Sequence, residues 1–152
     1  MEIFVRWLHF TAAVTWIGGM IFSPLVLIPV LKIIDPPPKR MELISAVGRR
    51  LRVVGWICIG ILLFTGVTML ISHPRYVEDL AATGFNQPLG IKLALVAIMV
   101  GFSFLHDFVL GPKMARAPGN PGLSRKIMIM IARVNLLVGL AVIAAGALLG
   151  AQ

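Results

Sequence analysis

Four long apolar runs constrain this chain more than any other feature of its sequence. They cover residues 3–34, 47–72, 89–111 and 127–149. Each run exceeds the ~20 residues that a helix needs to cross a ~30 Å hydrocarbon core. Charged residues make up only 13% of the chain, about half the share found in a soluble domain. The runs therefore predict an all-α fold, an integral membrane four-helix up-down bundle that forms a single membrane domain over residues 1–152.

Basic residues gather in the loops that follow the first and third runs. Those two regions contain Lys32, Lys39, Arg40, Arg49, Arg50, Arg52, Lys113, Arg116, Arg125 and Lys126. The opposite side has only Arg6, Arg75 and Lys92. Because positively charged loops stay in the cytoplasm, we expect both termini on the outer (periplasmic) side of a bacterial-type inner membrane. We also expect the first run to be retained as a helix that serves as the insertion signal.

Composition and motifs exclude several function classes. A net charge of +8 is compatible with nucleic acid binding, but here the basic residues lie at the ends of apolar runs, so no nucleic acid partner is expected. The single cysteine, Cys58, excludes a disulfide within the chain. The sequence contains no phosphate-binding glycine loop, nucleophile elbow, H-E-x-x-H or Cys-x-x-Cys motif. The expected partners are the lipid bilayer and either other membrane subunits or further copies of the chain.

One histidine, His9, lies inside the first apolar run. An ionisable residue at membrane depth is a functional-site hypothesis by default. Helical spacing places it on one face with small, aromatic and thioether side chains, those of Ala12, Ala13, Trp16 and Met20. The alternative is a neutral histidine that only forms a hydrogen bond with a neighbouring helix.

Depth in the membrane restricts how the histidines could bind haem. His9 and His73 are expected near the outer surface, whereas His106 lies about 21 Å from Lys92 along the third run. A bis-histidine haem b would therefore use His9 and His73. The structural alternatives are that His73 is only a polar helix end and that Lys92 snorkels to the surface. The residues expected at the propionates and against the ring of such a haem are Arg6, Arg75, Lys92 and Trp16.

A second polar cluster is expected near the cytoplasmic ends of the third and fourth runs. It consists of His106, Asp107, Arg133 and Asn135. A charge at this depth is costly without a partner, so Asp107 should pair with Arg133 or with an arginine of residues 49–52. The cluster is either a structural ion pair that holds helix register, or a proton path or headgroup site.

Soft metal ligands are also present, because thioether and imidazole groups together suit copper(I). No compact Met-x-x-Met or His-x-His element occurs. The alternative is that the methionines only fill the core or face lipid. The methionines concerned are Met20, Met69, Met99, Met114, Met128 and Met130.

Short motifs follow one another in a distinctive order along the chain. They are Leu8-His9, Trp16-Ile17-Gly18-Gly19 with Pro24, Arg49-Arg50-Leu51, Thr65-Gly66, Lys92-Leu93, Asp107-Phe108-Val109-Leu110-Gly111-Pro112, and Arg133-Val134-Asn135. In type and order they resemble the copper resistance protein D (CopD) type of four-helix membrane protein and the related HemJ-type protoporphyrinogen oxidases. This resemblance covers nearly the whole chain.

The two branches of the resemblance imply different functions. The HemJ type implies a b-type haem or a porphyrin substrate, with His9 and Lys92 at matching positions, and the CopD type implies copper handling. The chain departs from the HemJ type at Leu25, Leu136 and Leu137, where that type has an arginine, an acidic residue and a proline. These departures argue against protoporphyrinogen oxidase activity.

The leading hypothesis from the sequence is a haem b-binding inner-membrane protein with His9 and His73 as axial ligands. Such a protein would transfer electrons on the outer side or serve as a cytochrome b-like subunit of a membrane redox complex, rather than act as a stand-alone enzyme. One alternative is a copper transport or tolerance protein of the CopD type. The other is a structural membrane subunit without a cofactor.

Overall fold

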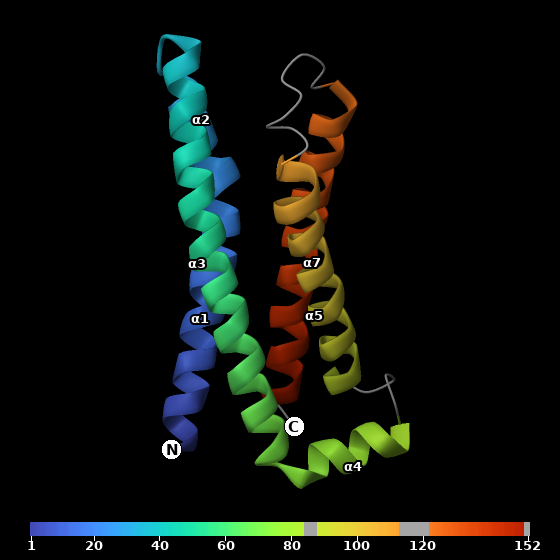
Figure 1. Ribbon diagram of the computed structural model, residues 1–152. Helices are drawn as coiled ribbons and strands as arrows, with labels where there is room; N and C mark the ends of the chain where they lie inside the picture. The colour runs from blue at the N-terminus through green and yellow to red at the C-terminus, as the bar shows by residue number, and fades with distance from the viewer. Residues whose placement is uncertain (84–87, 113–121, 151–152) are drawn as a thin grey trace. The chain divides into compact units, whose positions relative to one another are not determined.

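The computed structural model describes residues 1–83, 88–112 and 122–150, and these ranges are helical almost throughout (Figure 1). No β-strand occurs in them. The helices long and apolar enough to cross a membrane are Glu2–Leu31, Pro37–Ile71, Pro88–Leu110 and Lys126–Leu148. The predicted all-α fold with four membrane-length helices is therefore confirmed.

The chain divides into two compact units, Met1–Ser72 and His73–Gln152, and each is described by itself. Unit 1 consists of α1 (Glu2–Phe22), the π-type turn η1 (Ser23–Leu27), α2 (Ile28–Leu31) and α3 (Pro37–Ile71). The first three elements form one continuous rod, which lies antiparallel beside α3 (Figure 1). Unit 1 is therefore a helical hairpin.

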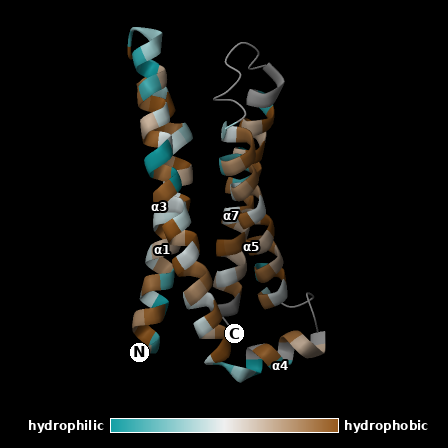
Figure 2. Cartoon of the chain, viewed as in Figure 1, coloured by the Kyte–Doolittle hydropathy of each residue, from teal (hydrophilic) through white to brown (hydrophobic). Residues whose placement is uncertain are grey.

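Small and medium-sized apolar side chains hold the two rods of unit 1 together. Ala12 and Ile17 of α1 are buried, as are Cys58 and Ile59 of α3. Small residues let helix backbones approach closely, and close packing is the main source of helix association in lipid. Large apolar side chains such as Phe64 are exposed instead, and apolar positions cover much of the hairpin (Figure 2). This surface is suited to contact with a lipid bilayer.

The turn η1 allows the first rod to continue through a proline. The backbone N–H of Ile28 reaches five residues back to the carbonyl of Ser23, just before Pro29. In a regular α-helix, a proline lacks the N–H to donate and its ring collides with the carbonyl four residues earlier. The wider π-type turn relieves this conflict, so the helix resumes as α2.

Helix α3 begins at Pro37, well before the predicted start at residue 47. Proline is accepted in the first turn of a helix, because N–H groups there have no partner within the helix. Lysine, arginine, methionine, glutamate and leucine follow within residues 39–46, and all are good helix formers. Arg40 orders the adjoining loop by donating from Nε to the carbonyl of Ile34 at 3.0 Å and by lying 3.2 Å from the Asp35 carboxylate.

Unit 2 consists of α4 (Pro74–Thr83), α5 (Pro88–Phe104), the π-type turn η3 (Leu105–Leu110) and α7 (Gly122–Gly150). The rod formed by α5 and η3 packs antiparallel to α7 (Figure 1). Like η1, the turn η3 ends two residues before a proline, here Pro112. Two basic residues of the predicted cytoplasmic loop, Lys113 and Arg116, lie outside the described residues.

Helix α4 lies between the second and third apolar runs. Pro74 suits the first position, and Leu80, Ala81 and Ala82 favour helix. The helix is too short and too polar to span a bilayer, so a search for apolar runs does not find it.

One stripe of α7 packs against α5. Ile131, Asn135 and Ala145 recur at helical spacing on α7 and are buried. Met99 and Ser103 of α5 are buried as well. Among the described residues of this second hairpin, the fully buried polar side chains are those of Ser103 and Asn135.

The contact between Trp16 and Gly55 tests the packing of the unit 1 hairpin. A Cβ atom at Gly55 would lie 3.5 Å from the indole Nε1 of Trp16, so Gly55→Ala should be tolerated. The larger side chain of Gly55→Leu should overlap the ring and lower the free energy of unfolding by about 1–3 kcal/mol. Thermal unfolding in detergent measures the effect. Gly60→Leu is the control, because a Cβ atom there meets nothing within 4 Å, and equal losses from both leucine variants would contradict this packing.

Candidate functional site

His9 contacts the facing helix through a short hydrogen bond. Its ring nitrogen Nδ1, on α1, lies 2.7 Å from Oγ1 of Thr65 on α3. Thr65 is 1% exposed, and His9 is half-buried. The same Oγ1 lies 2.6 Å from the carbonyl oxygen of Ile61, one turn earlier on α3. The three groups form a short relay inside the hairpin.

The protons available to this relay determine the tautomer of His9. A hydroxyl has one proton to donate, and two oxygens 2.6 Å apart need a proton between them. The Thr65 hydroxyl therefore donates to the carbonyl of Ile61, and its oxygen accepts the Nδ1–H of His9. In the neutral ring, the acceptor lone pair is then on Nε2. Metal-ligating histidines have the same arrangement, with the second ring nitrogen donating to an oxygen.

Glycines of α3 make room for two rings of α1. A Cβ atom at Gly66 would lie 3.6 Å from Cε1 of His9, and one at Gly55 would lie 3.5 Å from the indole of Trp16. Both rings therefore face α3, in agreement with the shared face expected from their spacing. Arg6, one turn before His9, is exposed.

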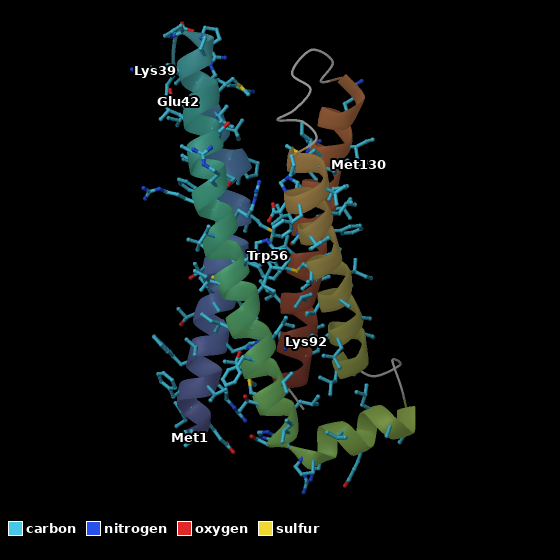
Figure 3. The ribbon with its side chains drawn as sticks, viewed as in Figure 1. Met1, Lys39, Glu42, Trp56, Lys92 and Met130 are labelled. Carbon is cyan, nitrogen blue, oxygen red and sulfur yellow. The ribbon has the colours of Figure 1, made fainter. Side chains whose placement is uncertain are left out.

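Three further predicted site residues belong to unit 2. His73 is half-buried just before α4, and Arg75 is exposed on α4. Lys92 is half-buried on α5, with Nζ 3.7 Å from the position that a Cβ atom would take at Gly146 of α7 (Figure 3). The carbonyl end of α7 carries partial negative charge and favours a cation nearby. Coordination of one haem by His9 together with His73 stays a prediction.

The second polar cluster contains two distinct contacts. Nδ1 of His106 lies 2.9 Å from Oδ1 of Asp107 within η3. Nδ2 of Asn135 on α7 donates to Oγ of Ser103 on α5 at 3.0 Å, and both residues are buried. Arg133 is exposed on α7. Pairing of Asp107 with an arginine stays a prediction, and the structure adds His106 as a partner of that carboxylate.

The side chains that could bind a metal in unit 1 are few, and they are soft ligands. Within the described ranges, no three or more histidine, cysteine or acidic side chains are grouped to hold a metal ion. Met69 is half-buried and follows Thr65 by one turn, so it shares the side of α3 that faces α1. Imidazole and thioether are the pair of ligands that suits copper(I). Another methionine considered from the sequence, Met114, lies outside the described residues.

The sequence singles out Thr65 only as part of a motif shared with the CopD and HemJ types, and it does not single out Ser103 at all. Hydroxyl side chains within helices usually bond the backbone of their own helix, so neither was expected to reach a second helix. A signal was nevertheless present in the antiparallel pairing of neighbouring runs. That pairing sets Thr65 opposite His9 and Ser103 opposite Asn135, which are polar residues at matching depth.

The relay predicts a tautomer that nitrogen NMR can measure. Wild type with ¹⁵N-labelled histidine should show His9 protonated on Nδ1, and Thr65→Ser should preserve this state because it keeps the hydroxyl. Thr65→Val retains the shape but removes the acceptor, so we expect a mixture of tautomers. His9→Ala assigns the signal. An unchanged spectrum in Thr65→Val would contradict the relay.

The buried contact in unit 2 predicts energetic coupling between Ser103 and Asn135. A double-mutant cycle of Ser103→Ala and Asn135→Ala, measured by thermal unfolding in detergent, should give a coupling energy of about 0.6 kcal/mol and at most about 1.7 kcal/mol. Ser103→Ala combined with Lys92→Met serves as the control, since these residues are three turns apart on α5 and should be additive. If the effects of Ser103→Ala and Asn135→Ala on the free energy of unfolding are additive, this hydrogen bond contributes nothing to stability.

Comparison with known proteins relates these features to a family. A family model described as copper resistance protein D matches residues 45–149, a range that includes α5 but not α1. An uncharacterized protein of Aquifex aeolicus (strain VF5) is 37% identical over 112 residues, which cover 74% of this chain and 71% of that protein. No solved structure matches the chain. With a family match over more than half of its length and a relative of this similarity, the chain belongs to the copper resistance protein D (CopD) family.

Proposed function

We propose that this protein handles copper in the membrane, as a transport or tolerance protein of the CopD type. Family membership favours copper over haem b. The single observation that carries the proposal is the 2.7 Å contact between His9 and Thr65. It assigns the lone pair of the ring to Nε2, which is the atom through which His9 would bind a metal.

Copper(I) is the ion that these side chains suit best. His9 supplies imidazole nitrogen, and Met69 supplies a thioether on the same side of the hairpin. Copper is cargo here, and a site with few ligands suits cargo that must leave again, because a conducted ion has to be bound weakly enough to be released. His9 and Met69 are therefore our proposed copper ligands.

We also infer the sidedness of the site. The basic loop between α2 and α3 supports a cytoplasmic location for that end of unit 1. Both termini would then face the periplasm, and His9 would lie a few residues below the outer surface of the inner membrane. Copper would enter the protein from that side.

Copper retention tests the proposal directly. Protein purified in detergent under reducing conditions and loaded with copper(I) should retain about one copper per chain. His9→Ala should retain none, and Met69→Leu should lower the affinity by at least tenfold, because each removes one soft ligand. Elemental analysis after desalting and a competition titration with a copper(I) chelator measure the two effects.

Matched variants separate the site from general effects. His106→Ala and Met130→Leu remove the same two side-chain types elsewhere in the chain, and both should keep wild-type affinity. Equal losses in these controls would contradict a site at His9. Retention of copper by His9→Ala with wild-type affinity would do so as well.

Haem b is the second candidate, and one observation favours it. An axial histidine also needs its proton on Nδ1 and its lone pair on Nε2, as the Thr65 contact provides for His9. Unit 1 contains no other histidine, so its hairpin alone supplies one axial ligand, and a second would come from a residue such as His73. When bound, haem would supply one-electron redox chemistry. Arg6, Arg75 and Lys92 remain candidates for its propionates.

The same purified sample distinguishes the candidates. If the wild-type protein retains no copper and shows a Soret band that His9→Ala loses, then His9 binds haem rather than copper. A colourless protein that retains copper would exclude haem. A protein that binds neither would favour a structural membrane subunit and contradict both proposals.

A further inference from the structure

We propose that Arg49 and Arg50, here called the arginine pair, bind the phosphate groups of anionic phospholipids. Both side chains are exposed on α3. Neither forms a hydrogen bond or ion pair with another residue in the described part of the chain. Guanidinium groups bind phosphate oxygens in a planar, two-pronged geometry. The pair therefore presents two unneutralised phosphate-binding groups.

The position of the arginine pair along α3 corresponds to the headgroup region. Residues 53–71 contain no charged side chain and are about 28 Å long at ~1.5 Å per residue, close to a ~30 Å hydrocarbon core. The arginine pair lies within one turn of the end of this stretch. Residues 37–48 continue α3 beyond it, and this part of the helix carries many of the hydrophilic positions of unit 1 (Figure 2).

Two tryptophans support the same boundary. Trp16 packs against Gly55, so its ring lies at the level of Trp56, which is itself half-buried on α3 (Figure 3). Tryptophan is enriched where hydrocarbon meets headgroups, since its ring is apolar and its N–H is polar. The two rings lie about one to two turns from the arginine pair, on its membrane side.

The acidic residues of unit 1 do not neutralise the arginine pair. Asp35 pairs with Arg40 at 3.2 Å. Glu42 precedes Arg49 by two turns, about 10 Å along the helix, and Glu2 lies at the opposite end of the rod formed by α1 and α2. The positive charge of the pair is therefore not neutralised by any acidic residue of unit 1.

Apolar side chains beside the arginine pair favour lipid as the source of that anion. A Cβ atom at Gly19 would lie 4.0 Å from Cδ2 of Leu51, which places the end of α1 beside this part of α3. On the membrane side of the pair, α3 exposes Val53, Val54 and Ile57, where the acyl chains of a bound lipid would lie. A phospholipid offers phosphate and acyl chain together, whereas nucleic acid and inorganic phosphate offer no apolar part. Charge and apolar surface together match an anionic lipid.

Lipid titration tests this inference independently of copper. Delipidated full-length protein in a neutral detergent is titrated with phosphatidylglycerol or phosphatidylcholine, and bound lipid is counted by native mass spectrometry. Wild type should prefer phosphatidylglycerol. The double variant Arg49→Gln/Arg50→Gln should lose about thirtyfold in affinity for it, since each basic group near an anionic surface contributes a factor of roughly five. Affinity for phosphatidylcholine should not change.

Controls determine whether the effect belongs to the arginine pair. Arg49→Lys/Arg50→Lys keeps the charge and should retain most of the preference. Lys126→Gln, an exposed basic residue on α7, should retain all of it. Equal binding of the two lipids by wild type, an unchanged preference in the double glutamine variant, or an equal loss in Lys126→Gln would overturn the proposal. If inorganic phosphate displaces phosphatidylglycerol when both are present at the same concentration, the ligand is a free phosphate and not a lipid.

Discussion

Lipid offers no hydrogen-bond partner, and this constraint governs the interior of both hairpins. Every polar group within a membrane span must find its partner inside the protein. The backbone meets this demand by forming helices, which continue past Pro29 through a π-type turn. Thr65 meets it by donating to the Ile61 carbonyl while accepting from His9. Asn135 meets it in part by donating to Ser103.

The same constraint links structure to function in unit 1. In water, the proton of a neutral histidine ring can sit on Nδ1 or on Nε2, and the two tautomers differ little in free energy. Inside an apolar hairpin, the acceptor that packing provides determines the tautomer. Thr65 has only an oxygen lone pair to offer, because its proton is already given to Ile61. This hydrogen bond therefore leaves the lone pair of His9 on Nε2, which supports the proposed role of that nitrogen as a copper ligand.

The sequence was sufficient for the four spans but not for the helix ends or the helix faces. Apolar length alone predicts a span, whereas the early start of α3 at Pro37 and the formation of α4 depend on helix propensity in stretches that are not continuously apolar. His9 could be singled out because ionisable residues are rare at membrane depth. Its partner Thr65 could be found only by pairing neighbouring runs antiparallel, since residues 53–71 contain no charged side chain that marks a face for packing. Only the contact with α1 shows which side of α3 turns inward.

X-ray absorption spectroscopy at the copper edge tests the central claim most directly, because it detects the atoms bound to the metal. Protein loaded with copper(I) should show a first shell of nitrogen and sulfur, with the outer-shell scattering of one imidazole. That imidazole contribution should vanish in His9→Ala and persist in His106→Ala. A loaded wild-type protein whose spectrum lacks imidazole, or whose imidazole signal survives in His9→Ala, would contradict the account.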